Sequence, residues 1–369
     1  MKGKKIIFIC SRLDTPGGIE RAVINTANLF VQKGHSVTLL VADVTGNTRC
    51  CYPLHPAVQV DFRSYSFGIG IRGNAISRKI RLYQDIKALR KYLKKQAADL
   101  LITTEYPFSI AAVLSGAGKK SRIIAWEHQH FNWSKKNKFW RWLQEKIYPR
   151  LERMVCLNET EAAHYSRYTP VTVIPNFIEQ VYKDNQSYHK KQLLTVGWLI
   201  HRKGTDLLLP IAKTILNKFP DISWKLVGDG ELKELVQDFI RNENLGGRLL
   251  LQSPGETDID AVYRESGLFV LPSRNEAFPM VLLEALSYGI PCISFNCPSG
   301  PSAIITQAED GWLVEPENTA RLSEAIIQLL NEPERRQQMS VNALKNIQRF
   351  DKEKIYPLWA TLINNTNQK

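Results

Sequence analysis

The sequence predicts two α/β domains, each built around a parallel β-sheet that is buried on both faces. Short, unbroken apolar runs of strand length alternate with helical patterns along nearly the whole chain. A polar stretch at residues 180–190 interrupts this alternation, which then restarts. The 369 residues also exceed what one hydrophobic core ordinarily organises. We therefore expect two Rossmann-like domains facing a central cleft, with ligands beyond the carboxyl ends of the strands.

The first domain is expected at residues 1–183. Its strands are short and rich in Val, Ile and Leu, at residues 5–10, 36–41, 100–103, 122–125, 154–157 and 171–174. Its helical patterns occupy residues 20–32, 76–95 and 137–153. The basic N-terminus imitates a signal peptide, but its apolar stretch is too short and polar residues follow at once, so a first strand fits better.

The second domain is expected at residues 184–350. Its strands are at residues 193–196, 224–227, 249–251, 268–271 and 292–295. Its helices are at residues 205–218, 231–244, 281–287 and 319–330. Since each strand is followed by a helical pattern, both sheets should be parallel.

Composition excludes several classes of protein. The six cysteines form no C-x-x-C pair, which excludes a zinc ribbon or a thioredoxin-type motif and favours a reduced, cytoplasmic chain. No apolar run reaches the roughly 18 residues that span a bilayer.

The two halves of the chain differ in charge. Residues 1–183 hold 29 Lys and Arg against 13 Asp and Glu, whereas residues 184–369 hold 20 Lys and Arg against 23 Asp and Glu. This asymmetry predicts that the first domain faces an anionic partner.

Two motifs match known patterns in the wrong context. Residues 68–73 satisfy the dinucleotide fingerprint G-x-G-x-x-G, but they follow no clear strand, so a glycine loop is the better interpretation. Asp258 and Asp260 form a D-x-D pair of the kind that holds a metal in some glycosyltransferases. They stand where a helix should begin, which favours helix capping over metal binding.

The strongest candidate site is the segment 273–291. A strand ends there in a polar loop, and Pro279 then opens a helix whose backbone N–H groups can hold an anion such as a pyrophosphate. Glu276 lies in the loop and Glu284 in the helix, so both could face one crevice. Two solvated surface glutamates are the alternative, although the apolar neighbours of Glu284 predict a mostly buried carboxylate that needs partners.

Glu276 and Glu284 form an E-x7-E pair. The pair and its surrounding sequence resemble the signature of retaining nucleotide-sugar glycosyltransferases of family 4, which have the GT-B fold. The resemblance covers nearly the whole chain, through further matches at residues 17–21, 174–176, 196–204, 227–231 and 310–314. Within the family, the chain is most similar to bacterial enzymes that build O-antigen, capsule or exopolysaccharide repeats. The resemblance also implies that the C-terminal segment 351–369 forms a helix crossing back to the first domain.

The resemblance implies the roles of individual residues. Glu284 would bind the nucleotide ribose, Glu276 the hydroxyls of the transferred sugar, and Lys203 with Arg202 the diphosphate. The other donor-side positions are Gly18, Ala277, Phe278 and Pro279. On the acceptor side, the resemblance places Gly17 and Glu127 in loops and His128 beside the transferred sugar, so that His128 and Glu276 are the expected catalytic pair. His130 is the alternative histidine.

The resemblance further implies an enzyme with no metal and no cofactor besides a nucleotide-sugar donor, which is most commonly UDP-linked in this family. Three positions depart from the family pattern. Trp198 stands where an arginine that grips the diphosphate is common, Ala277 replaces a glycine, and Ala303 replaces a glutamate. The departure at Trp198 weakens the diphosphate assignment unless Arg202 substitutes for the missing arginine.

The basic half of the chain suggests where the acceptor is presented. Residues 72–150 carry 18 Lys and Arg against 5 Asp and Glu, and Trp126, Trp133, Trp140 and Trp142 lie close to lysines. Aromatic and cationic side chains together favour an anionic bilayer interface, where a lipid-diphosphate acceptor would be found. A solvated basic helix with core aromatics is the alternative.

We therefore expect a retaining hexosyltransferase that acts on a lipid-linked or growing polysaccharide at the inner face of the plasma membrane. A nucleotide-sugar epimerase or a sugar phosphorylase on the same scaffold is the alternative enzyme. A basic nucleic-acid binder is the non-enzymatic alternative, but no helix-turn-helix, zinc finger or RNA-binding signature is evident, so no nucleic-acid partner is expected.

Overall fold

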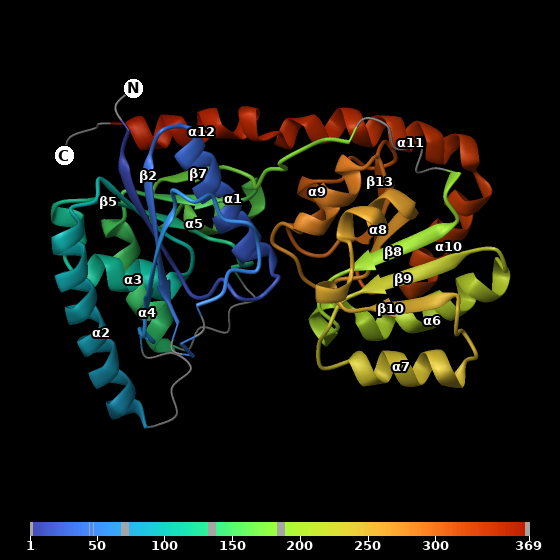
Figure 1. The fold of residues 1–369 in the computed structure, drawn as a ribbon, viewed down its shortest axis with the longest axis horizontal. Coiled ribbons are helices and arrows are strands. Elements are labelled where there is room, and N and C mark those ends of the chain that lie inside the picture. Colours follow the sequence, from blue (N-terminus) through green and yellow to red (C-terminus); the bar gives the residue numbers. More distant parts are fainter. Residues whose placement is uncertain are drawn as a thin grey trace. The chain divides into compact units, whose positions relative to one another are not determined.

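The computed structural model describes residues 3–43, 45–46, 48–67, 74–131, 138–182 and 189–365. The chain divides into two compact units, one formed by Met1–Pro175 with Ile355–Lys369 and the other by Asn176–Lys354. In each unit a parallel sheet lies between flanking helices (Figure 1). The expected domain boundary at residue 183, the glycine motif at residues 68–73 and Trp133 lie outside the described residues.

Unit 1 contains, in its described part, a seven-stranded parallel sheet in the order β3-β2-β1-β4-β5-β6-β7. The strands are β1 (Lys5–Cys10), β2 (Ser36–Ala42), β3 (Gln59–Arg63), β4 (Leu100–Thr103), β5 (Arg122–Trp126), β6 (Arg153–Cys156) and β7 (Val171–Val173). The helices are α1 (Gly18–Gln32), α2 (Ala75–Gln96), α3 (Tyr106–Leu114), α4 (Lys138–Ile147) and α5 (Glu159–Tyr165).

Four features of unit 1 differ from the sequence prediction. Strand β3 and helices α3 and α5 were not expected, and α3 lacks an amphipathic period because nearly all of its residues are buried. The helix expected at residues 137–153 ends at Ile147. A short 3₁₀ turn containing Pro149 follows it, and Arg153 already begins β6.

The C-terminal helix α12 (Lys352–Asn364) packs on unit 1 from Ile355 onward. Trp359 is 1% exposed, and its ring centre lies 5.6 Å from that of Phe30 and 5.2 Å from that of Trp126. The Arg122 guanidinium donates to the carbonyl oxygens of Leu362 at 2.6 Å and Ile363 at 2.9 Å, so it caps the last turn of the helix. Aromatic burial and these hydrogen bonds together hold α12 on unit 1.

Unit 2 contains a six-stranded parallel sheet in the order β10-β9-β8-β11-β12-β13 among its described residues. The strands are β8 (Gln192–Val196), β9 (Ser223–Val227), β10 (Leu249–Gln252), β11 (Ser266–Leu271), β12 (Cys292–Phe295) and β13 (Gly311–Val314). The helices are α6 (Thr205–Lys218), α7 (Lys233–Asn242), α8 (Ile259–Glu265), α9 (Met280–Ser287), α10 (Thr319–Asn331) and α11 (Pro333–Asn346).

Both sheets follow the strand order of Rossmann-like folds, which confirms the predicted fold class. Counted from the first strand of each unit, the order is third, second, first, fourth, fifth and sixth, with β7 added at the end of the first sheet. The strand order reverses between β1 and β4 in unit 1 and between β8 and β11 in unit 2. In open α/β sheets, ligands bind beyond the carboxyl ends of the strands at this reversal.

Candidate active site

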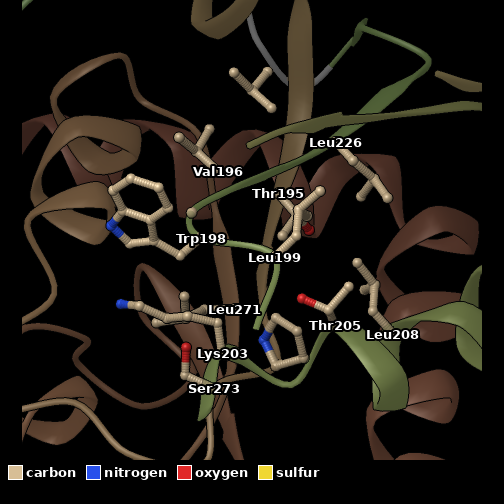
Figure 2. A pocket seen from close by; sticks show the side chains of 13 residues that line it. Thr195, Val196, Trp198, Leu199, Lys203, Thr205, Leu208, Leu226, Leu271 and Ser273 are labelled. Carbon is tan, nitrogen blue, oxygen red and sulfur yellow. The ribbon is translucent and has the colours of Figure 1, made fainter. Parts of the chain in front are cut away.

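A pocket lies at the point in unit 2 where the strand order reverses. It has about 340 Å³ of open space, counted out to the solvent at its mouth. Its walls come from the segments that follow β8 and β11 and from the start of α6, including Gly197, Trp198, Lys203, Thr205 and Ser273 (Figure 2). The fold therefore brings residues from distant parts of the sequence to the edge where a ligand is expected.

An ion pair stands beside this pocket. Nζ of Lys203 lies 2.5 Å from Oε1 of Glu276, and the Ser273 hydroxyl donates to the same oxygen at 2.8 Å. Figure 2 shows the Lys203 amino group and the Ser273 hydroxyl on the same side of the pocket. The two charged side chains are only 19% and 7% exposed. A buried carboxylate needs such partners, and a cation at this position can also meet an anionic ligand.

Two glycines permit these loops to approach each other. Gly204 has φ +70°, and a Cβ there would lie 1.9 Å from the carbonyl oxygen of Pro272. Gly300 lies so close to Glu276 that a Cβ would lie 2.6 Å from its carbonyl oxygen. Side chains at either position would push the loops apart and separate Lys203 from Glu276.

Glu284 lies in α9, as the sequence predicts, but it is half-buried rather than mostly buried. The Tyr263 hydroxyl, which comes from α8, donates to Oε2 of Glu284 at 2.8 Å. Glu276 and Glu284 therefore have different partners, one a cation and the other a phenol.

The remaining donor-side candidates of unit 2 are sequence neighbours of Lys203 and Glu276. The Arg202 side chain is half-buried and makes no hydrogen bond or ion pair within the part of the chain that the structure describes, which leaves its charge available. Pro279 is the residue immediately before α9, and Ala277 is half-buried in the loop. Phe278 instead packs into the core, with its ring centre 5.6 Å from that of Phe350.

The D-x-D pair has a structural role, as predicted. Asp258 caps α8 by accepting hydrogen bonds from the backbone N–H groups of Asp260 and Ala261. Asp260 accepts a hydrogen bond from the Tyr288 hydroxyl at 2.5 Å. Among the residues that the structure describes, no group of three or more His, Cys, Asp or Glu side chains could hold a metal ion.

In unit 1, the strand-order reversal carries acidic and hydroxyl groups. The Ser11 hydroxyl, directly after β1, donates to Oε1 of Glu105, which follows β4, at 2.7 Å. Burial raises the pKa of the Glu105 carboxyl above its usual value. Gly17 precedes α1 and Gly18 begins it, and a Cβ on Gly17 would lie 2.2 Å from Oε2 of Glu20. Glycine thus lets the Glu20 carboxylate fold back over the start of α1, and burial raises its pKa as well.

The loop after β5 carries three buried polar side chains, Glu127, His128 and His130, each 7% exposed. His130 has an acidic neighbour, because its Nδ1 lies 2.7 Å from Oε1 of Glu161, although the contact does not have hydrogen-bond geometry. The His128 ring packs against Trp126 with ring centres 4.2 Å apart and 56° between the planes, and its Nε2 has no hydrogen-bond partner among the described residues. Burial lowers the pKa of His128 to about 3, so its imidazole is neutral at physiological pH.

Two family models together match nearly the whole chain. "Glycosyl transferases group 1" matches residues 178–346, and "Glycosyltransferase Family 4" matches residues 16–180. The chain is a family 4-type glycosyltransferase with the GT-B fold. The enzyme class and the resemblance predicted from the sequence are therefore confirmed.

None of the helices in the described part of this glycosyltransferase is long and apolar enough to cross a membrane.

Relatives of the glycosyltransferase carry specific names. One relative is the GalNAc-α-(1→4)-GalNAc-α-(1→3)-diNAcBac-PP-undecaprenol α-1,4-N-acetyl-D-galactosaminyltransferase of Campylobacter jejuni. The two sequences are 26% identical over 97% of this chain and 98% of the relative. The glycosyltransferase is 29% identical over 70% of this chain and 73% of the relative to the UDP-Gal:α-D-GlcNAc-diphosphoundecaprenol α-1,3-galactosyltransferase of Escherichia coli. The S. aureus TarM structure, in complex with fondaparinux, α-GlcNAc-glycerol and UDP, shares the fold with a TM-score of 0.78, 15% identity and coverage of 98% and 100% of the two chains.

Sequence reasoning missed several residues that shape the site. Ser273 begins the candidate segment 273–291, but its role was not predicted, although a hydroxyl soon after a central strand is a usable signal. Tyr263 gave no signal, because its partner Glu284 lies 21 residues away on another helix. Arg274 is likewise fixed by contacts that the sequence does not show, with its guanidinium in a bidentate pair with Asp206 at 2.7 Å.

Proposed function

We propose that this glycosyltransferase retains anomeric configuration and moves a hexosyl unit from a nucleoside-diphosphate sugar, with UDP favoured, to a lipid-diphosphate-linked acceptor in bacterial surface polysaccharide synthesis. The observation that carries the proposal is the Lys203–Glu276 pair beside the pocket at the strand-order reversal of unit 2. The Campylobacter jejuni and Escherichia coli relatives support it, since their names specify undecaprenol-linked acceptors and, for the second, a UDP-sugar donor.

The donor side uses Lys203 as its central cation. An ammonium group has three donors, so Lys203 can hold Glu276 and a diphosphate oxygen at the same time. Arg202, which has no side-chain partner among the described residues, then supplies the second charge where Trp198 replaces an arginine. These cations stabilise the departing diphosphate, so the proposed reaction needs no metal. Glu276 accepts hydrogen bonds from sugar hydroxyls, and Glu284 from the ribose.

The acceptor side uses the loop after β5. A neutral His128 with an unpartnered Nε2 can exchange a hydrogen bond with a sugar hydroxyl at the reacting centre, whereas Nδ1 of His130 lies against the carboxylate of Glu161. This difference favours His128 over His130. Gly17 and Glu127 are the other acceptor-side residues in this proposal.

Ligand-dependent thermal stability tests the donor site. Wild type and Glu284→Ala are melted with UDP, GDP, ADP and CMP and their sugar conjugates, each with and without EDTA. A ligand at about 100 times its dissociation constant adds roughly 2.7 kcal/mol of stability. We expect one nucleotide series to stabilise the wild type, EDTA to change nothing, and Glu284→Ala to lose the effect. No stabilisation by any nucleotide would contradict the donor site, and NMR of the product anomer tests retention.

We further propose that unit 1 docks peripherally on an anionic membrane at the cytoplasmic face. Exposed apolar side chains follow one face of α2 and α4, namely Ile76, Ile80, Tyr83, Phe139 and Trp142, with exposures between 40% and 68%. The Lys79 ammonium of α2 lies 5.9 Å from the centre of the Phe139 ring of α4, which brings these two side chains together. Apolar groups among Lys and Arg suit an anionic bilayer interface.

Co-sedimentation with vesicles of phosphatidylglycerol and phosphatidylethanolamine tests the docking. We expect binding at low salt that Phe139→Ser with Trp142→Ser reduces several-fold. Leu235→Ser, at a 46% exposed leucine of unit 2, is the matched control and should bind like the wild type. Equal binding of both variants would contradict this surface. Strong, salt-dependent binding to arbitrary DNA would favour the nucleic-acid alternative.

A further inference from the structure

One oxygen of Glu284 is held by a tyrosine from a different βα unit. Tyr263 lies near the end of α8 and is 2% exposed, and its hydroxyl donates to Oε2 of Glu284 at 2.8 Å. Glu284 itself is half-buried in α9. The bond therefore joins a fixed, buried ring to a carboxylate that reaches solvent.

The Tyr263 ring is fixed by stacking. Its ring centre lies 5.2 Å from that of Tyr288 with 12° between the planes, and the Tyr288 ring lies 3.9 Å from that of Tyr182 at 13°. The Arg264 guanidinium covers the Tyr182 ring at 4.8 Å. The Tyr288 hydroxyl donates to Asp260 at 2.5 Å. Rings stacked in this way keep the direction of each hydroxyl constant.

This rigidity matters for a glutamate that must bind a ligand. A free glutamate side chain samples many rotamers, and ordering it costs part of the binding free energy. A hydrogen bond from a fixed phenol to one carboxylate oxygen holds the plane of the carboxylate before any ligand arrives. Pre-ordering of this kind strengthens binding without adding a contact to the ligand.

We propose that Tyr263 is a positioning residue that orients the Glu284 carboxylate for the ribose hydroxyls of the donor nucleotide. The inference rests on the proposed function, which makes Glu284 the ribose ligand. Tyr263 touches Glu284 and acts on the ligand only through it. Its contribution therefore depends on whether the ligand has ribose hydroxyls.

The test compares each nucleotide with an analogue that lacks those hydroxyls. Dissociation constants of UDP, GDP and ADP and of their 2′,3′-dideoxy forms are measured by calorimetry for the full-length wild type and for Tyr263→Phe. We expect Tyr263→Phe to weaken the preferred ribonucleotide about three- to tenfold and to leave its dideoxy form unchanged. In steady-state assays KM for the donor should rise by the same factor, with kcat nearly constant.

A matched control removes a hydroxyl from the neighbouring ring. Tyr288→Phe loses the hydrogen bond to Asp260 but leaves the Tyr263–Glu284 bond, so its ratio of ribo to dideoxy affinity should equal that of the wild type. Glu284→Ala should abolish the difference between the two ligands. In the Glu284→Ala background, Tyr263→Phe should then have no further effect on the ratio.

The outcomes separate this inference from the proposed function. If Glu284→Ala loses the ribose preference but Tyr263→Phe keeps it, the positioning role is overturned and the donor site stands. Equal weakening of the ribo and dideoxy forms in Tyr263→Phe would show a structural role alone and would also overturn it. If Glu284→Ala keeps the preference, the ribose role of Glu284 is wrong, and the positioning role of Tyr263 falls with it while the rest of the donor site stands. If no nucleotide binds the wild type, the donor site itself is contradicted and both proposals fall.

Discussion

Replacing Lys203 by methionine should destabilise the protein even when no ligand is bound. Methionine keeps an apolar stem but leaves the Glu276 carboxylate with the Ser273 hydroxyl and without the ammonium 2.5 Å away. Removing one partner of a fully buried pair costs about 3–5 kcal/mol. Because the Lys203 side chain is 19% exposed, water replaces part of the loss, and we expect about 2–3 kcal/mol. For a domain of this size that corresponds to a melting temperature lower by about 5–10 °C.

Calorimetric melting of the ligand-free protein measures the effect. The matched control is Lys191→Met, which breaks an ion pair with Asp221 at 2.7 Å whose side chains are 67% and 58% exposed, and its melting temperature should not change. Lys203→Met combined with Glu276→Met should regain most of the stability, because no buried charge remains unpaired. If Lys203→Met melts together with the wild type, the ion pair does not form in the free protein and our account of the donor site fails.

Three further predictions concern pH and packing. Arg274 lowers the pKa of the Asp206 carboxyl below its usual 3.8, so the ion pair adds stability above pH 3.8 and loses it as the pH falls through the lowered pKa. The free energies of unfolding of wild type and Asp206→Asn, measured in urea, should therefore approach each other below pH 3.8. A difference that stays constant with pH would contradict the pairing. Burial lowers the pKa of His128 to about 3, so between pH 6.5 and pH 3 the imidazole is protonated in the unfolded chain but not in the folded one. This difference should lower the free energy of unfolding by about 1.4 kcal/mol for each pH unit toward pH 3. In urea titrations, His128→Gln should show a smaller decrease over the same range. Trp359→Ala should cost about 3–5 kcal/mol by calorimetry, since the ring is buried against Trp126, and unchanged melting would mean that α12 is not docked on unit 1.

The fold could be predicted because strand and helix signals alternate strongly in both halves. Buried parallel strands need unbroken apolar runs, and β1, β4 and β11 have them. The elements that were missed have weaker patterns. The β3 segment Gln-Val-Asp-Phe-Arg lies at the sheet edge and is only partly buried, so it carries polar residues. Periodicity cannot identify α3 either, because a helix buried on almost all sides shows no polar face.

The candidate site could be predicted as a set of residues but not as a set of contacts. Glu276 follows a central strand, and Lys203 follows the strand beside it, so the reversal in strand order brings them together across 73 residues of sequence. No local pattern states that the two side chains pair. The choice between His128 and His130 was similarly open in the sequence, because only the packing shows that Glu161 engages one of them.

The two glutamates of the E-x7-E pair lie in different electrostatic surroundings, which follows from where their partners lie in the fold. Glu276 is paired with a cation, so a diphosphate that competes for Lys203 also changes what Glu276 can bind. Glu284 accepts a hydrogen bond from the phenol of Tyr263. In the proposed function, binding of the diphosphate and contact with the transferred sugar are therefore coupled through one ion pair, while ribose recognition is set by a hydroxyl on a stacked ring. Spacing in the sequence places both glutamates near one helix start, but only the partners from η4 (His201–Lys203) and α8 give them separate tasks.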